Sequence, residues 1–171
     1  MTTDDAPTAP VSDPTVIDDI MDRDRRNGAV ALRADAVGIF YSHRDFITIL
    51  YKSGNVIRYL GGRHGDNILR IPDSFPEPVL AFYGAAQLGI VTRFDKTVQS
   101  DHPAEELLRI VLASSIQEEK FDLPPGHNLA VYGNAPTTSA TTHWETEVWS
   151  ENPAVHPTPV VPSDIALNAD T

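Results

Sequence analysis

The chain has 171 residues and a mass of 18.7 kDa, which is room for one domain of ordinary size with terminal extensions. Hydrophobic residues make up 41% of it and charged residues 22%, as is typical of a globular protein. Because the chain has no cysteine, disulfides, thiolate metal sites and thiol nucleophiles are excluded. No apolar run approaches the roughly 20 residues of a membrane span, and residues 1–7 lack the pattern of a signal peptide. We therefore expect a cytoplasmic protein, or a virion-associated one if a phage encodes it.

Composition divides the chain into three parts. Residues 1–15 and 150–171 are rich in proline and small polar residues, and they offer little apolar surface to bury. We expect both segments to be disordered tails around a single domain over residues 16–149. The chain has ten arginines and three lysines. An excess of arginine over lysine resembles the proteins of a GC-rich bacterium or of its phage, and it indicates nothing about mechanism.

Helix and strand signals follow one another through the first half. Asp13 and Pro14 predict the start of a short amphipathic helix that ends at Gly28. Runs of branched and aromatic residues then predict strands over 30–34, 36–41, 46–51 and 55–60. The sequence Ser53-Gly54-Asn55 predicts a hairpin turn between the last two of these strands. The run 46–51 is apolar on both faces of a strand, which predicts a central position in the sheet.

The second half predicts a further strand over 68–71, a helix over 79–88 that ends at Gly89, and a strand over 90–94. The acidic start at 101–106 and the spacing of apolar residues from Leu107 to Ile116 predict an amphipathic helix. Two short strands, 129–132 and 143–149, complete the series. Because most strands precede the helices, we expect an α+β fold: a largely antiparallel sheet of five to seven strands with two or three helices.

The formal charge of −11 is unevenly distributed. Residues 1–26 carry −4, residues 27–100 carry +2, and residues 101–171 carry −9. Acidic flanks of this kind keep a protein soluble. Alternatively, the β-rich block presents a basic surface to an anionic partner, which could be the acidic C-terminal segment itself. Nucleic acid is disfavoured as a partner, because the overall charge opposes binding to a phosphate backbone.

The loop from Gly61 to Asn67 is the first candidate binding site. It holds three glycines, Arg63 and His64 between two predicted strands. Backbone N–H groups and a guanidinium in such a loop could bind a phosphate or carboxylate, so Gly62, Arg63, His64 and Arg44 are the candidate anion-binding residues. The loop precedes a strand rather than a helix, so it matches neither a P-loop nor a dinucleotide fingerprint. Its alternative role is a tight connection between strands.

The segment His143-Trp144-Glu145-Thr146-Glu147 is a candidate metal site. On a strand, His143, Glu145 and Glu147 would share one face, and an imidazole with two carboxylates suits a divalent metal. Residues two apart on a strand are about 6.6 Å apart, which is wide for ligands of one ion. The alternative is a solvated polar face opposite a buried Trp144.

No motif of a known enzyme class is found, we see no resemblance to a known family, and we expect no cofactor. We therefore predict a non-enzymatic interaction or assembly protein that binds another protein or itself, through aromatic residues Phe75, Phe82, Tyr83 and Trp149. The small residues from Gly84 to Ala86 predict close packing in the core or against a second chain. The alternative is a small enzyme or ligand-binding domain that uses the Gly61–Asn67 loop.

Overall fold

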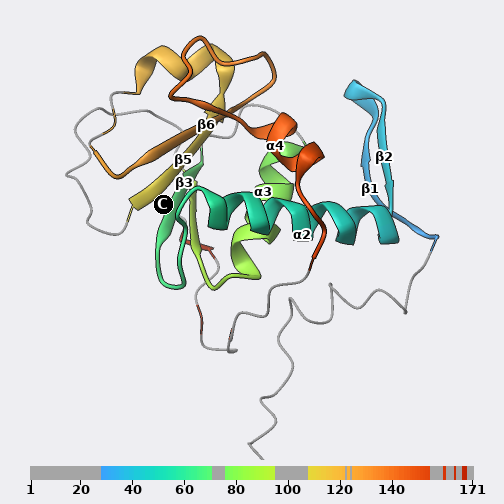
Figure 1. The fold of residues 1–171 in the computed structure, drawn as a ribbon. Helices are drawn as coiled ribbons and strands as arrows, with labels where there is room; N and C mark the ends of the chain where they lie inside the picture. The colour runs from blue at the N-terminus through green and yellow to red at the C-terminus, as the bar shows by residue number, and fades with distance from the viewer. Residues whose placement is uncertain are drawn as a thin grey trace, which may run out of the picture.

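A computed structural model of the chain describes residues 28–70, 76–94, 108–121, 123, 125–154, 160, 164 and 167–168. These residues form a six-stranded sheet, three α-helices and a separate two-stranded hairpin (Figure 1). The predicted mixture of helices and strands is confirmed. The predicted antiparallel sheet is wrong: every pair of neighbouring strands in the large sheet is parallel, and among the described strands only the hairpin is antiparallel.

The hairpin comprises β1 (Val30–Ala34) and β2 (Ile39–Ser42), joined through a single 3₁₀ turn. The strands predicted over 30–34 and 36–41 are therefore present, the second beginning three residues later. Figure 1 shows the hairpin standing apart from the large sheet, at the N-terminal end of α2 (His43–Tyr59). Its half-buried side chains Leu32 and Tyr41 pack against a buried cluster formed by Phe46, Ile47 and Leu50 of that helix and by Leu80.

Helix α2 replaces the two strands predicted over 46–51 and 55–60, and no hairpin turn lies at Ser53-Gly54-Asn55. The side chain of Ser42 caps the helix by accepting the backbone N–H of Asp45 at 3.2 Å. The buried positions repeat every three or four residues, which is the helical period: His43, Phe46, Ile47, Leu50, Ser53, Gly54, Val56 and Ile57. The apolar run that predicted a two-faced strand is thus one buried stripe of a helix.

Helix α3 (Glu77–Ala86) connects β3 (Asn67–Arg70) to β4 (Val91–Phe94) in a parallel crossover. The predictions of these three elements are confirmed. Gly89, with φ of +65°, ends the helical segment as expected.

Glycines 54 and 84 allow α2 and α3 to cross at close range. A Cβ on Gly84 would lie 2.8 Å from the Cβ of Ser53 and 3.0 Å from the backbone nitrogen of Gly54. The crossing is reinforced by Gln87, whose side-chain amide donates to the carbonyl of Leu50 at 2.6 Å. The small residues of α3 therefore serve packing within this chain.

Strand β5 (Leu108–Ser114) lies where an amphipathic helix was predicted, so that prediction is wrong. Its residues from Ile110 to Ala113 are all at most 1% exposed, which means that both faces of the strand are covered. A strand buried on both faces has a continuous apolar run, and such a run resembles part of a helical stripe when it is read alone. Residues 101–107 of the predicted helix lie outside the described residues.

Strand β6 (Asn128–Tyr132) confirms the strand predicted over 129–132. The strand predicted over 143–149 is wrong in most of its length, because only β7 (Thr142–His143) is extended and α4 (Trp144–Ser150) follows at once. Trp144 is 1% exposed and points from the first turn of α4 into the core.

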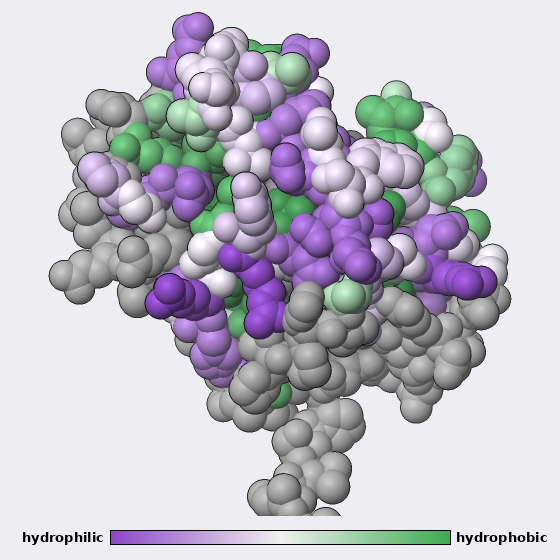
Figure 2. All heavy atoms as spheres, viewed as in Figure 1, coloured by the Kyte–Doolittle hydropathy of each residue, from purple (hydrophilic) through white to green (hydrophobic). Residues whose placement is uncertain are grey.

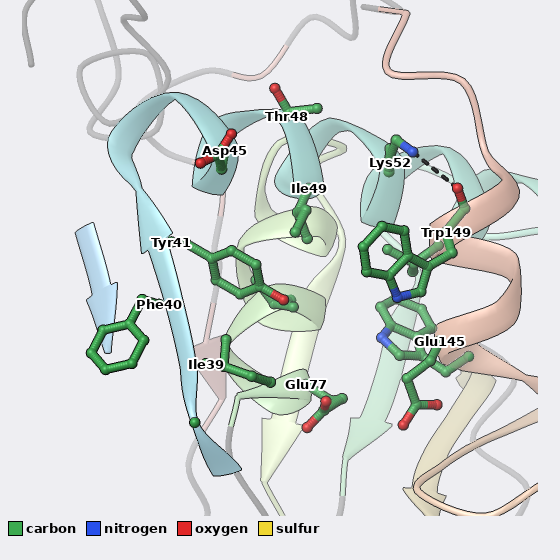
Figure 3. A pocket seen from close by; sticks show the side chains of 14 residues that line it. Ile39, Phe40, Tyr41, Asp45, Thr48, Ile49, Lys52, Glu77, Glu145 and Trp149 are labelled. Atoms are coloured by element: carbon green, nitrogen blue, oxygen red, sulfur yellow. Dashed lines mark hydrogen bonds between the residues drawn. The ribbon is translucent and has the colours of Figure 1, made fainter. Parts of the chain in front are cut away.

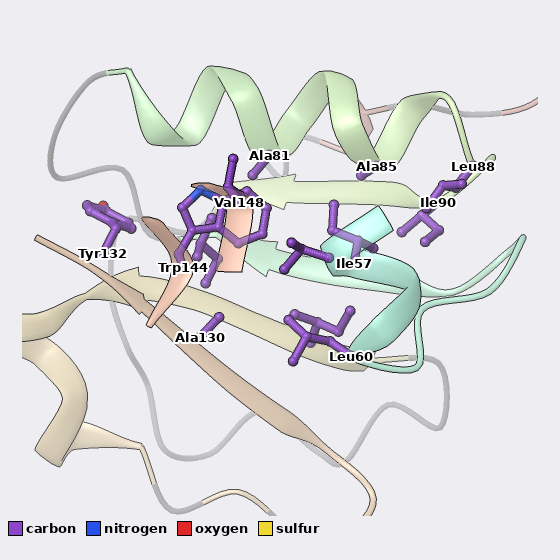
Figure 4. Close-up of a cluster of buried hydrophobic side chains, with 13 residues drawn as sticks. Ile57, Leu60, Ala81, Ala85, Leu88, Ile90, Ala130, Tyr132, Trp144 and Val148 are labelled. Atoms are coloured by element: carbon purple, nitrogen blue, oxygen red, sulfur yellow. The ribbon is translucent and has the colours of Figure 1, made fainter. Parts of the chain in front are cut away.

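The strand order is β7-β6-β5-β3-β4-β8, with β8 (Leu167–Asn168) at one edge. Helices α2, α3 and α4 pack together against one face, and Figure 4 shows their buried side chains meeting those of the strands. This core contains Val56, Ile57, Leu60, Ala81, Ala85, Leu88, Ile90, Ile110, Leu112, Ala130, Tyr132, Trp144 and Val148. In the part of the chain that the structure describes, no helix is long and apolar enough to cross a bilayer.

Residues 13–27 of the predicted first helix and the predicted tail of residues 1–15 lie outside the described residues. Parts of the segment 150–171 are described and make contacts. The side-chain amide of Asn55 donates to the carbonyls of Asn152 and Ala154, at 2.8 and 3.0 Å. Asp164 lies 3.0 Å from Nε2 of His64, and β8 pairs with β4. The division into one domain with two tails stays a prediction.

Candidate functional site

The topology singles out one edge of the sheet. From β3 the chain crosses through α3 to β4 on one side, whereas β5, β6 and β7 continue on the other side of β3. In open parallel sheets, ligands bind beyond the carboxyl ends of the strands, where the strand order reverses in this way. The N-terminal ends of α3 and α4 lie at this edge, because each helix follows a strand of the sheet.

A pocket of about 620 Å³ opens at this edge, between the hairpin and the three helices (Figure 3). Its size is within the range of cavities that hold small organic ligands. Most of its wall is apolar, with polar groups at a few places. The described lining residues are Gly38, Ile39, Phe40, Tyr41, Asp45, Thr48, Ile49, Lys52, Glu77, Leu80, Trp144, Glu145, Val148 and Trp149.

Acidic groups from three elements face this pocket. Glu77 begins α3, Glu145 lies in the first turn of α4, and Tyr41 reaches in from β2 (Figure 3). Burial raises the pKa of Glu77, and the nearby carboxylate of Glu145 raises it further. Burial likewise raises the pKa of the Tyr41 phenol, with a smaller contribution from Glu77. The pocket therefore brings two interacting carboxyl groups and a phenol together in an apolar setting that disfavours the charged forms of Glu77 and Tyr41.

Carboxylates also hold the loop of residues 133–141, which follows β6 at the same edge. The backbone N–H of Gly133 donates to Oε1 of Glu145 at 2.6 Å. The backbone N–H of Thr137 donates to Oε2 of Glu118 at 2.8 Å. The hydroxyls of Thr138 and Thr141 lie 3.0 Å apart in a hydrogen bond. The loop of residues 133–141 is thus held by two acidic side chains.

The carboxyl group of Glu118 links the stability of this loop to pH. The N–H of Thr137 lowers the pKa of this carboxyl against the opposing effect of burial, and its bonds with Thr141 and Thr138 lower it further. A carboxyl group whose pKa is lowered by folding stabilises the folded state at neutral pH. This contribution to stability is lost as the pH falls below the ordinary pKa of glutamate and through the lower pKa of the folded state.

We expect Glu118→Gln to lower the melting temperature at pH 7, with a difference from the parent chain that shrinks as the pH falls from about 5 to 3. Thermal unfolding across this pH range measures the effect. The matched control is Glu119→Gln, since Glu119 is the exposed neighbour of Glu118. A Glu118→Gln deficit that is the same at every pH would contradict this role.

The Gly61–Asn67 loop lies away from this edge, because it precedes β3 and so adjoins the amino ends of the strands. Gly62, Arg63 and His64 line a separate pocket of about 400 Å³ together with Arg58. The backbone N–H groups of Gly62 and Arg63 already donate, to the carbonyl of Ile57 and the carboxylate of Asp66. Arg44 is in the first turn of α2, about 25 Å along that helix from the loop. The structure thus brings three of the four candidate anion-binding residues together.

The candidate metal ligands are only partly assembled. Nε2 of His143 lies 3.4 Å from Oε2 of Glu145, and of the three residues only Glu145 lines the 620 Å³ pocket. Among the described residues, no group of three or more His, Asp or Glu side chains could hold a metal ion. The single strand face on which the three residues were expected does not exist, since Glu145 and Glu147 are in α4.

The candidate interface residues are dispersed. Phe75 lies outside the described residues. Phe82 and Tyr83 stack edge to face on α3 with ring centroids 5.1 Å apart, and both are half-buried. Trp149 is 78% exposed, at the rim of the 620 Å³ pocket. Figure 2 shows apolar residues gathered instead on hairpin β1–β2, beside the hydrophilic surface of α2.

Two groups at this edge were not foreseen from the sequence as parts of a site. Neither Glu77, the first residue of α3, nor Glu118, in the 3₁₀ segment that follows β5, is among the candidate residues of the sequence analysis. Likewise the basic residues Arg44, Lys52 and Arg58, expected on a sheet, lie along helix α2.

Comparison with known proteins identifies the fold. No protein-family model matches the sequence, and no curated protein matches it. Solved structures do match. An anthranilate CoA ligase in complex with anthranoyl-AMP superposes with a TM-score of 0.70 at 19% identity, over 87% of this chain and 30% of that one. An acyl-CoA synthetase from Brucella canis superposes with a TM-score of 0.71 at 18% identity, over 92% of this chain and 31% of the synthetase. A benzoate CoA ligase from Burkholderia xenovorans superposes with a TM-score of 0.69 at 21% identity, over 88% of this chain and 31% of the ligase.

These neighbours correct the functional prediction. The chain has the fold of a segment of acid–CoA ligases, and it spans about 30% of the length of the structures it matches. The prediction of a non-enzymatic protein-binding or assembly protein is contradicted, because the fold is found in enzymes. The suggested phage origin likewise has no support among these neighbours. The likeness to these ligases lies in the backbone geometry, and the sequences are less than 25% identical. Neither the composition of the chain nor a search for short motifs could therefore reveal it.

Proposed function

We propose that this chain forms one lobe of a carboxylate-activating enzyme of the acid–CoA ligase type. The observation that carries the proposal is the structural likeness to such ligases along about nine-tenths of the chain. In such a reaction, a carboxylate oxygen attacks the α-phosphorus of ATP and pyrophosphate leaves. The sulfur of CoA then attacks the acyl carbon of the resulting acyl-AMP, and AMP leaves.

The carboxyl edge of the sheet is where this lobe would contact the acyl adenylate. The loop of residues 133–141 follows β6 there and carries hydroxyl groups on Thr137, Thr138, Ser139 and Thr141. Hydroxyl and backbone N–H groups are common donors to phosphate oxygens. Residues 133–143 contain one glycine and no lysine or arginine. The charge of pyrophosphate would therefore be neutralised by other parts of the enzyme, and this lobe would contribute orientation through hydrogen bonds.

Binding of a non-reactive acyl adenylate tests the proposal. We expect the chain to bind a benzoyl or hexanoyl sulfamoyl-adenosine saturably in isothermal titration calorimetry. Thr138→Ala should weaken binding about threefold to tenfold, the usual effect of one lost hydrogen bond. Ser150→Ala is the control, because its hydroxyl donates to the carbonyl of Glu147 at the far end of α4. Equal affinity for the Thr138 and Ser150 variants would remove this loop from the site, and no binding by the folded chain would contradict the proposal.

A further inference from the structure

A threonine, a histidine and a glutamate form a chain of side-chain contacts at the junction of β7 and α4. Thr146 is exposed, and its Oγ1 lies 2.7 Å from Nδ1 of His143 in a hydrogen bond. Nε2, on the other side of the same imidazole, lies 3.4 Å from Oε2 of Glu145. The other oxygen of this carboxylate, Oε1, accepts the backbone N–H of Gly133 at 2.6 Å. A hydroxyl group, a base and a third group that orients the base are the parts of an activated nucleophile.

The change from strand to helix brings the three side chains together. His143 is the last residue of β7, and Glu145 and Thr146 lie in the first turn of α4. On a continuous strand Thr146 would point away from His143, whereas at the start of a helix residues three apart are neighbours. Trp144 is 1% exposed and anchors this junction in the core. The fold therefore holds the hydroxyl group against the imidazole.

The carboxylate of Glu145 favours one tautomer of His143. Nε2 of the imidazole and Oε2 of the carboxylate are both closed to solvent, and neither makes a hydrogen bond with a described residue. A proton on Nε2 is attracted by the carboxylate at 3.4 Å, whereas a lone pair on Nε2 would be repelled by it. In the neutral ring, a proton on Nε2 leaves the lone pair on Nδ1. Nδ1 is therefore the atom that accepts the hydroxyl proton of Thr146.

The same contact assists removal of that proton. When Nδ1 takes the proton, the imidazole becomes a cation beside the carboxylate of Glu145. The attraction between the two is strong because both facing atoms are shielded from water. The hydroxyl group of Thr146 lies on the opposite side of the ring, at an exposed residue that a reagent in solution can reach.

We propose that Thr146 is a reactive nucleophile that activated esters acylate, with His143 as the general base and Glu145 as a positioning residue. Oγ1 of Thr146 attacks the acyl carbon of the ester, and its proton passes to Nδ1 of His143. The bond between the acyl carbon and the leaving oxygen then breaks, and that oxygen takes the proton from Nδ1. The products are an ester on Thr146 and the free alcohol or phenol of the donor. The proposal does not rest on acyl-adenylate binding, since any activated ester supplies the acyl group.

Acetylation of the full chain by para-nitrophenyl acetate tests the proposal. Peptide mass spectrometry at successive times locates each acetyl group and measures the rate at which it is acquired. The matched hydroxyl is that of Ser150, which is exposed in the same helix and donates to the carbonyl of Glu147 rather than to an imidazole. We expect Thr146 to be acetylated at least about tenfold faster than Ser150, because only Thr146 has a general base. Equal rates at the two hydroxyl groups, or acetylation of lysines without acetylation of Thr146, would overturn the proposal.

Variants of the hydroxyl group and of the base identify the nucleophile. Thr146→Ser should keep the acetylation at this position. His143→Gln should slow the acetylation of Thr146 by about a hundredfold, the usual worth of general-base catalysis. Circular dichroism shows whether each variant is folded, and the acetylation map of the parent chain decides the proposal even where His143→Gln fails to fold. Acetylation of Thr146 at the parent rate in folded His143→Gln would contradict the role of the base.

Glu145→Gln tests the positioning role separately. Its amide oxygen can still accept from Gly133, while its NH₂ group faces Nε2 of His143 and favours the tautomer with the proton on Nδ1. We expect acetylation of Thr146 to slow by about tenfold or more, and nitrogen NMR of the imidazole to show the change of tautomer. Glu147→Gln, two residues further along α4, is the matched control and should change neither readout. An unchanged tautomer in Glu145→Gln, or equal acetylation rates in the two variants, would overturn the assignment of Glu145.

Discussion

Trp144→Ala should lower the free energy of unfolding by about 3–5 kcal/mol, the usual cost of truncating a large buried aromatic residue. Trp144 is 1% exposed, and it joins the first turn of α4 to the core between the sheet and the other two helices (Figure 4). Its removal would leave a cavity that a short helix of seven residues cannot refill. Urea denaturation followed by far-ultraviolet circular dichroism measures the loss.

Trp149→Ala is the matched control, in the same helix but 78% exposed. We expect it to change stability by no more than about 0.5 kcal/mol. If the two tryptophan variants had similar stability, α4 would not be anchored through Trp144, and the wall it provides to the pocket would not be fixed.

Gly84→Ala should destabilise the chain by roughly 1–3 kcal/mol, the usual cost of overpacking a tight contact. The added methyl group would lie 2.8 Å from the Cβ of Ser53 and 3.0 Å from the backbone nitrogen of Gly54. Backbone cannot move aside as a flexible side chain does, so α2 and α3 would have to separate.

The sign of this effect is diagnostic. Helix propensity alone predicts that alanine at a glycine within a helix stabilises by about 1 kcal/mol. A gain in the urea midpoint of the Gly84→Ala variant would therefore show that α2 and α3 do not cross as closely as the structure has them.

Gly54 illustrates why part of the fold was misread from the sequence. Between two apolar runs, Ser53-Gly54-Asn55 has the composition of a turn, and local rules assign it one. The glycine is instead required inside a helix because α3 passes over it, and that requirement comes from a segment thirty residues away in the sequence. Elements whose signals are local, such as α3 with its terminal Gly89 and strands β1, β4 and β6, were predicted correctly.

Strand β5 shows a different limit. Its apolar run is the signature of a strand buried on both faces, but the same residues fit a helical stripe when the preceding acidic segment is taken as a helix start. The failure to predict a parallel sheet followed from this error. With a helix assigned to residues 108–114, no crossover connection to a central strand could be recognised. The pocket was also beyond reach, since it combines Tyr41, Glu77 and Glu145 from three separate elements.

The pairing of β4 with β8 has a consequence for how the sheet is completed. Thr92 is paired with Leu167, about 75 positions later in the sequence, and β8 follows every other described strand. Closing so long a loop lowers the entropy of the chain before the strand pairing can stabilise the fold. Such non-local strand pairs therefore form late, and they slow the folding of parallel sheets. Until β8 arrives, the N–H and C=O groups along the outer side of β4 are available to strands of other molecules. The interval before this last closure is when the chain is most exposed to self-association.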